Sequence, residues 1–146
     1  MAIAAESAAD RVEQLISLTE RVTALLAQDT ADFEAHRPHE AASRAVESGR
    51  LANLYRHEST RVRRDPGLIA DAPLERRVHL TRATEAMELV LKRHARALEA
   101  AKIITEGIVR AVAEEASTRR VPASGYGPSA RANNADATPI ALNRKA

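Results

Sequence analysis

The sequence contains no cysteine and no tryptophan, and its aromatic side chains are Phe33, Tyr55 and Tyr126. Without cysteine there is no disulfide, thiol nucleophile or cysteine-ligated zinc, so nothing in the chain requires an oxidising compartment. Large aromatics usually dominate a compact globular core, whereas packed helices can rely on Ala, Leu, Val and Ile. The scarcity of aromatics therefore predicts helices packed around a thin core.

Long apolar runs are also missing. Every apolar run is interrupted by a charged residue well short of the roughly 18 residues that a membrane-spanning helix needs. The first fourteen residues carry Glu6, Asp10 and Glu13 but no basic region, which argues against a secretory signal. We therefore expect a cytoplasmic protein that does not insert into a membrane.

The first predicted helix covers residues 8–36. Its apolar residues recur at spacings of three, four and seven, which is the period of a helix; they are Val12, Leu15, Val22, Leu26 and Phe33. Pro38 is the first break, and proline disfavours helical conformation at the residue before it. It predicts either a kink or a short stop, and of the two we favour the kink.

Two further helices are predicted, over residues 40–64 and 73–118. Asp65-Pro66-Gly67 is strong turn chemistry between them, and Leu68 and Ile69 are expected to pack onto the helices. The last helix has a near-heptad apolar spacing. The pattern predicts an all-α fold with a helical domain over residues 1–120. The architecture would be a long antiparallel helical hairpin or a three-helix, coiled-coil-like array.

The composition changes abruptly after Arg120, to Pro, Gly, Ser, Asn and Ala. Residues 119–146 carry five basic side chains and one acidic side chain. This segment has too little apolar surface to offset the entropy that it would lose on ordering. We therefore predict that residues 121–146 form a flexible, disordered basic tail.

Groups that could carry chemistry are scattered. His36 and His39 are separated by Pro38, and the other histidines stand alone, so metal binding is disfavoured. No glycine-rich phosphate loop or Ser/His/Asp arrangement is present, and we predict no catalytic, cofactor-binding or metal-binding residues and no enzyme activity. His94 occupies a heptad position, where we expect a partly buried histidine bonded across the hairpin.

Arginines cluster near the predicted turn at residues 65–67; they are Arg61, Arg63, Arg64, Arg76, Arg77 and Arg82. No aromatic residues interleave with them and no recognition-helix pattern is present, so the sequence does not favour nucleic-acid binding. A solvated helix end is the simpler interpretation, and contact with an acidic partner is another.

The stretch 103–116 near the end of the last helix is unusually apolar. Ile104, Ile108 and Val112 lie on one face at a spacing of four. They could pack against the first helix, or they could grip the helix of another protein, as amphipathic helices commonly do. The sequence leaves both interpretations open.

Several motifs resemble the FlgN-like flagellar proteins, particularly the branch called FlbY. They are EQLISLTER at 13–21, RPHEAA at 37–42, LANLYRHE at 51–58, ITEGIV at 104–109 and GYGP at 125–128. The similarity covers residues 10–128.

The resemblance implies a bacterial cytoplasmic chaperone of flagellar type III export, located in the cytoplasm or at the flagellar base. Such a chaperone covers hook-associated subunits and delivers them to the export gate. The family's C-terminal helix contacts the subunit, matching Ile104, Ile108 and Val112, and its tail tyrosine serves docking at the gate, matching Tyr126. The alternatives are a structural coiled-coil component or assembly regulator of the flagellar base without cargo, and a nucleic-acid-binding regulator.

Overall fold

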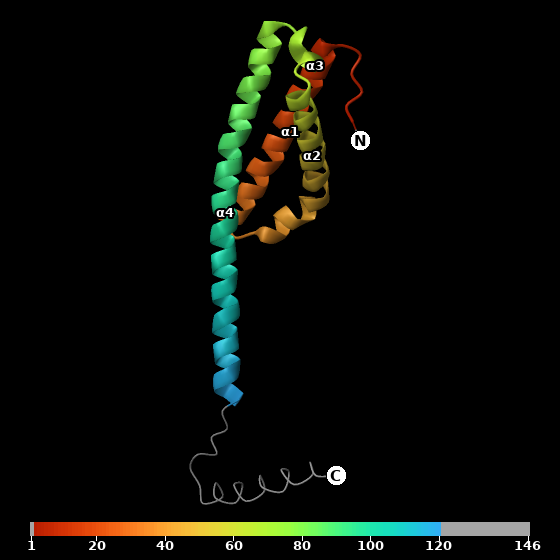
Figure 1. Ribbon diagram of the computed structural model, residues 1–146. Coiled ribbons are helices and arrows are strands. Elements are labelled where there is room, and N and C mark those ends of the chain that lie inside the picture. The colour runs from red at the N-terminus through yellow and green to blue at the C-terminus, as the bar shows by residue number, and fades with distance from the viewer. Residues whose placement is uncertain (1, 121–146) are drawn as a thin grey trace, which may run out of the picture. The chain divides into compact units, whose positions relative to one another are not determined.

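The computed structural model describes residues 2–120, and within that range it contains four helices and no strand (Figure 1). They are α1 (Ala8–Glu34), α2 (Pro38–Arg64), α3 (Gly67–Ala70) and α4 (Leu74–Arg120). The all-α prediction is confirmed, and α1, α2 and α4 correspond to the three expected helices. The predicted tail, residues 121–146, lies outside the described residues. Among residues 2–120, no helix has both the length and the apolar character of a membrane span.

The chain divides into two compact units, Met1–Ile104 and Thr105–Ala146, and α4 contributes residues to both. The first unit holds α1, α2, α3 and α4 as far as Ile104. In the second unit the described part is residues 105–120, here named the distal segment, and all of its residues are exposed.

The start of α1 is fixed by side-chain caps. The Ser7 hydroxyl accepts a hydrogen bond from the backbone N–H of Asp10 at 3.1 Å. The Asp10 carboxylate in turn accepts hydrogen bonds from the Gln14 side-chain amide and the Glu6 backbone N–H, each at 3.0 Å. Both bonds lower the pKa of Asp10, and the bond from Gln14 has the larger effect. The negative charge of Asp10 therefore lies at the N-terminus of the helix, where the helix dipole favours it.

The first helix ends before Pro38 and a second helix begins there. The prediction of one helix kinked at Pro38 is therefore wrong. His36 adopts a left-handed conformation with φ of 58°, and its N–H bonds to the carbonyl of Phe33 at 3.1 Å. The N–H of Arg37 bonds to the carbonyl of Asp32 at 2.8 Å. This pair of bonds is a Schellman motif, which ends a helix by satisfying its last carbonyls. Pro38 then begins α2, where its missing N–H costs nothing.

Within the first unit, α4 runs alongside α1 in the same direction, because α2 reverses the chain between them (Figure 1). Three side-chain contacts follow the two helices in the same order: Glu13 with Arg76, Glu20 with His79, and Glu34 with Arg93. Sequential helices are therefore antiparallel, as the predicted three-helix array requires.

The core of the first unit is thin and contains two clusters of buried apolar residues. One contains Val12, Ile16 and Ala72, with Ile69 of α3 packed against it. This confirms the expected packing for Ile69, whereas Leu68 lines a hollow at the surface. The other is made by Leu18, Val22 and Met87, which join α1 to α4. Leu51, Leu54 and Tyr55 of α2 pack against this second cluster.

Charged groups are buried between α1 and α2. Glu58 is fully buried; its carboxylate lies 3.4 Å from Nη1 of Arg11 and accepts the backbone N–H of Ile3 at 2.9 Å. The hydrogen bond from Ile3 to Glu58 ties the segment before α1 to α2. A buried ion pair fixes geometry more than it adds stability, because desolvation offsets most of the Coulomb attraction.

A second ionic cluster joins the ends of α1 and α2 near their turn. Arg44 of α2 donates to Asp29 at 3.0 Å and also to Asp32, both of which are buried on α1. Ser48 donates to Asp29 at 3.3 Å. Hydrogen bonding to Asp32, and then to Asp29, raises the pKa of Arg44. The cluster pins α2 against α1 where large apolar side chains are few.

Candidate partner-binding surfaces

The predicted partner-binding residues Ile104, Ile108 and Val112 are exposed. Their exposed fractions are 45%, 59% and 60%, and residues four apart lie on the same face of a helix. Ile103 and Val109 beside them are as exposed, at 60% and 63%. The fourth predicted residue, Tyr126, lies outside the described residues.

These exposures bear on the two interpretations of the stretch 103–116. Within the first unit, α1 ends at Glu34, whose carboxylate meets Arg93. The side chains of α4 that follow are covered at Ala97 and partly at Ala101, and every described residue from Lys102 onward is exposed. Ile108 and Val112 are thus among the exposed large apolar side chains of the described residues.

An open groove lies between α2 and α4 of the first unit, with α1 as its floor. Its volume is about 320 Å³, at the lower end of the range of roughly 300–1,000 Å³ common for binding pockets. The residues that line it are Val22, Leu25, Leu26, Ser48, Ala52, Tyr55, Arg56, Ser59, Thr60, Arg63, Met87 and Leu91.

The groove combines an apolar base with a basic edge. Leu25 and Leu26 form part of the base, and Leu91 on the α4 side is 48% exposed. Arg56 and Arg63 line the α2 side, are exposed, and form no ion pair among residues 2–120. The groove therefore suits an apolar helix face that carries acidic residues along one edge.

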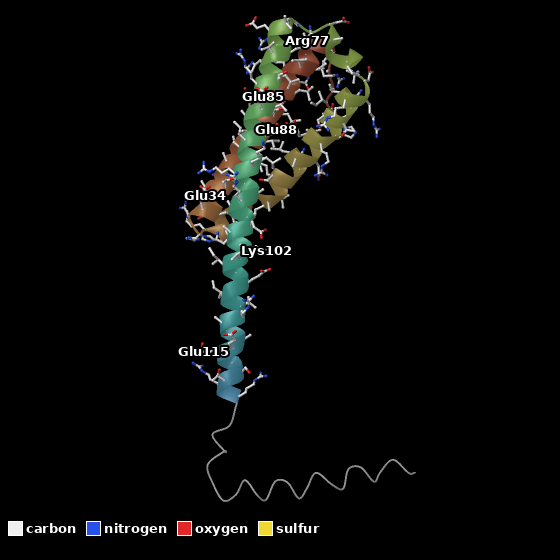
Figure 2. The ribbon with its side chains drawn as sticks, turned by 60° about the vertical axis from the view of Figure 1, so that its left-hand side comes forward. Glu34, Arg77, Glu85, Glu88, Lys102 and Glu115 are labelled. Carbon is white, nitrogen blue, oxygen red and sulfur yellow. The ribbon has the colours of Figure 1, made fainter. Side chains whose placement is uncertain are left out.

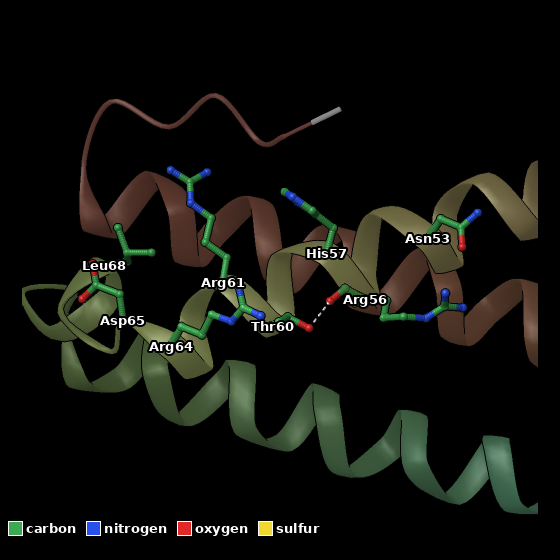
Figure 3. Close-up of a pocket in the computed structure, with 8 residues that line it drawn as sticks. All are labelled: Asn53, Arg56, His57, Thr60, Arg61, Arg64, Asp65 and Leu68. Atoms are coloured by element: carbon green, nitrogen blue, oxygen red, sulfur yellow. Dashed lines mark hydrogen bonds between the residues drawn. The ribbon is translucent and has the colours of Figure 1, made fainter.

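A second hollow, of about 670 Å³, lies on α2 next to α3, and Figure 3 shows its lining. Arg56, Arg61 and Arg64 project around it, and Asp65 and Leu68 close one end. The structure thus brings together two arginines of the predicted cluster, Arg61 and Arg64. Arg76 instead pairs with Glu13 of α1 at 2.9 Å.

His94 contacts α1 as predicted. Its Nδ1 lies 3.0 Å from the hydroxyl oxygen of Thr30, and its ring meets that of Phe33 edge to face, with centroids 5.9 Å apart. Among residues 2–120, no three His, Asp or Glu side chains converge where they could hold a metal ion.

Sequence reasoning missed the groove. Its signal was the distribution of apolar residues on α2: Leu51 and Leu54 pack against the Leu18 cluster, while Ala52 and Tyr55 line the groove. When the apolar stripe of a helix is wider than the surface that one neighbouring helix covers, it indicates a second contact. Tyr55 takes part in both surfaces.

The fold and these surfaces define a small all-helical protein with exposed apolar helix faces. The chain is 56% identical to the flagellar basal-body protein FlbY of Caulobacter vibrioides over 149 aligned positions, which cover 100% of both chains. The chain belongs to the FlbY family, as its motifs indicated. No family model matches the chain, and no solved structure matches it.

Proposed function

We propose that the chain is a flagellar assembly protein of the export-chaperone kind, acting in the cytoplasm and at the flagellar base. Its α4 binds an amphipathic helix of a hook-associated subunit and keeps that helix from assembling early. The chaperone then delivers the subunit to the type III export gate. No catalytic step and no nucleic acid enter this function.

The exposed apolar face of α4 is the observation that carries the proposal. Ile104, Ile108 and Val112 are 45–60% exposed at a spacing of four, and an uncovered apolar patch marks an interaction surface. A subunit helix with apolar residues at the same spacing buries such a face by helix-to-helix packing. The family resemblance supports the subunit as partner and Tyr126 as the residue that docks at the gate.

A structural role is the alternative, and it is favoured by the description of the Caulobacter relative as a basal-body protein. In that role the chain is a coiled-coil component or assembly regulator of the flagellar base, and it carries no cargo. The same exposed face would then bind a neighbouring component of the base.

The substitution Ile108→Glu separates these roles. Because Ile108 is 59% exposed, we expect the variant to keep the helix content and melting temperature of the natural protein. A charge placed in the interface should abolish recovery of hook-associated subunits in a pull-down from flagellated cells. The matched control is Leu89→Glu, at an α4 position 67% exposed that neither lines the groove nor shares this face.

Two outcomes contradict the chaperone role. Ile108→Glu that recovers subunits as well as the natural protein excludes this face as the subunit site. A natural protein that recovers basal-body components but no exported subunit supports the structural role instead.

A further inference from the structure

We propose that the groove between α2 and α4 receives the distal segment of a second copy of this chain, so that the protein self-associates. The distal segment is residues 105–120 of α4. The proposal does not depend on the chaperone role, and it assigns an occupant to a surface that the chaperone role does not use.

The groove is the open side of a helical bundle. α1 is flanked by α2 and α4, and the apolar residues between them, including Leu26, Tyr55 and Leu91, are not covered by a further helix among residues 2–120. Four-helix bundles bury such residues by adding one more amphipathic helix. The missing element is therefore a helix with an apolar face.

The distal segment has that face. Ile108 and Val112, one turn apart, are 59% and 60% exposed, and Ala111 stands between them. Branched aliphatic side chains next to an alanine allow close approach of two helices, because the small residue leaves room for the neighbour's side chains. This face is apolar, as is the base of the groove, which is formed by leucines, Met87 and Tyr55.

Charge favours the same occupant. The segment as a whole carries three carboxylates and three arginines, but Glu114 and Glu115 lie just after the apolar Val112. The groove's edge carries Arg56 and Arg63, which have no ion-pair partner within residues 2–120. Glu115 pairs with Arg119 of its own helix at 2.6 Å. Both side chains are exposed, and exposed pairs of this kind contribute little, so exchanging this partner for a groove arginine costs little.

The chain's lack of cysteine permits a direct test by disulfide trapping. Ser59→Cys places a thiol in the groove, and Ala111→Cys places one on the apolar face of the distal segment. The two variants, one carrying an affinity tag, are mixed and oxidised. A disulfide requires Cβ atoms about 3.5–4.5 Å apart, so it reports direct contact.

Ser117→Cys is the matched control, because residue 117 is exposed on the opposite side of the same helix from Ile108. We expect a mixed disulfide between the Ser59→Cys and Ala111→Cys variants. It should form faster and more completely than the disulfide between the Ser59→Cys and Ser117→Cys variants. Equal trapping of both, or none with Ala111→Cys, overturns the proposal.

Sedimentation equilibrium of the full chain provides the second measurement. We expect association below about 100 µM, with Leu91→Glu in the groove and Ile108→Glu in the segment each weakening it about tenfold or more. Leu89→Glu, outside the groove, should leave association unchanged, and circular dichroism verifies that each variant folds. A monomer at about 100 µM overturns self-association. It would leave the subunit pull-down with Ile108→Glu as an independent test of the chaperone role.

Discussion

The hydroxyl oxygen of Thr30 on α1 lies 3.0 Å from Nδ1 of His94 on α4. Thr30 donates its one hydroxyl proton to the carbonyl of Leu26 at 2.6 Å, so its oxygen is the acceptor for the histidine. Nδ1 of His94 therefore carries the hydrogen. This bond fixes both the tautomer and the ring orientation of His94 against Phe33.

Replacing Thr30 with valine should lower the free energy of unfolding by about 1–3 kcal/mol, because it leaves a half-buried Nδ1–H without its acceptor. Urea denaturation checks this. The double variant Thr30→Val/His94→Phe removes both polar groups, and we expect it to lose less than the two single changes together. Full additivity of the two changes would show that the hydrogen bond contributes nothing.

Glu58 should be the most sensitive ionic position in the first unit. Glu58→Ala leaves the guanidinium of Arg11, which is 7% exposed, without its counter-charge. Breaking a buried pair on one side typically costs about 3–5 kcal/mol, a large part of a domain's total stability. Thermal unfolding measures the loss, and hydrogen exchange should show that the Ile3 amide is no longer protected.

The matched control replaces both partners, as Arg11→Met/Glu58→Met. Because no charge remains unpaired, this double variant should be more stable than Glu58→Ala. If Glu58→Ala costs no more than an exposed substitution, the buried pair does not hold α1 to α2.

The pair between Glu34 and Arg93 should make stability depend on pH. Figure 2 shows Glu34 at the end of α1, and its carboxylate accepts two hydrogen bonds from Arg93, at 2.8 and 2.5 Å. These bonds lower the pKa of Glu34 below its ordinary value of 4.5. The stabilisation is therefore fully present above pH 4.5 and is lost as the pH falls through the lowered pKa.

The measurement compares Glu34→Gln with the natural protein by urea denaturation at neutral pH and at about pH 3. The difference between the two proteins should shrink on acidification. Glu88→Gln is the control, since Glu88 on α4 is exposed (Figure 2) and forms no ion pair within residues 2–120. A difference that is the same at both pH values would contradict the pair's contribution.

Helix positions were predictable because they depend on local signals. The apolar period and the turn residues around Pro66 placed α1, α2 and α4 to within a few residues. The stop after Glu34 was only the less favoured of two alternatives, since it depends on His36 adopting a left-handed conformation, which histidine adopts less readily than glycine. Pro38 therefore appeared to interrupt one helix, although it begins the next.

The surfaces were predictable only in part. The exposure of Ile108 is not encoded near residue 108, because apolar residues at helical spacing are equally typical of a buried face. The burial of the Glu58 carboxylate could not be predicted either, because its partner Arg11 lies 47 positions away in the sequence. His94 was predictable, because its heptad position already placed it against a neighbouring helix.

The parallel course of α1 and α4 sets an order of folding. Contacts between α1 and α2 start with short loops, such as the 15 positions from Asp29 to Arg44, and extend to the 47 positions from Arg11 to Glu58. Glu20 of α1 and His79 of α4 are 59 positions apart. During synthesis α1 and α2 can pair as soon as both have left the ribosome, but α4 emerges later. Until then Val22 and Leu18 lack Met87, so each nascent chain passes through a stage in which one side of α1 is bare.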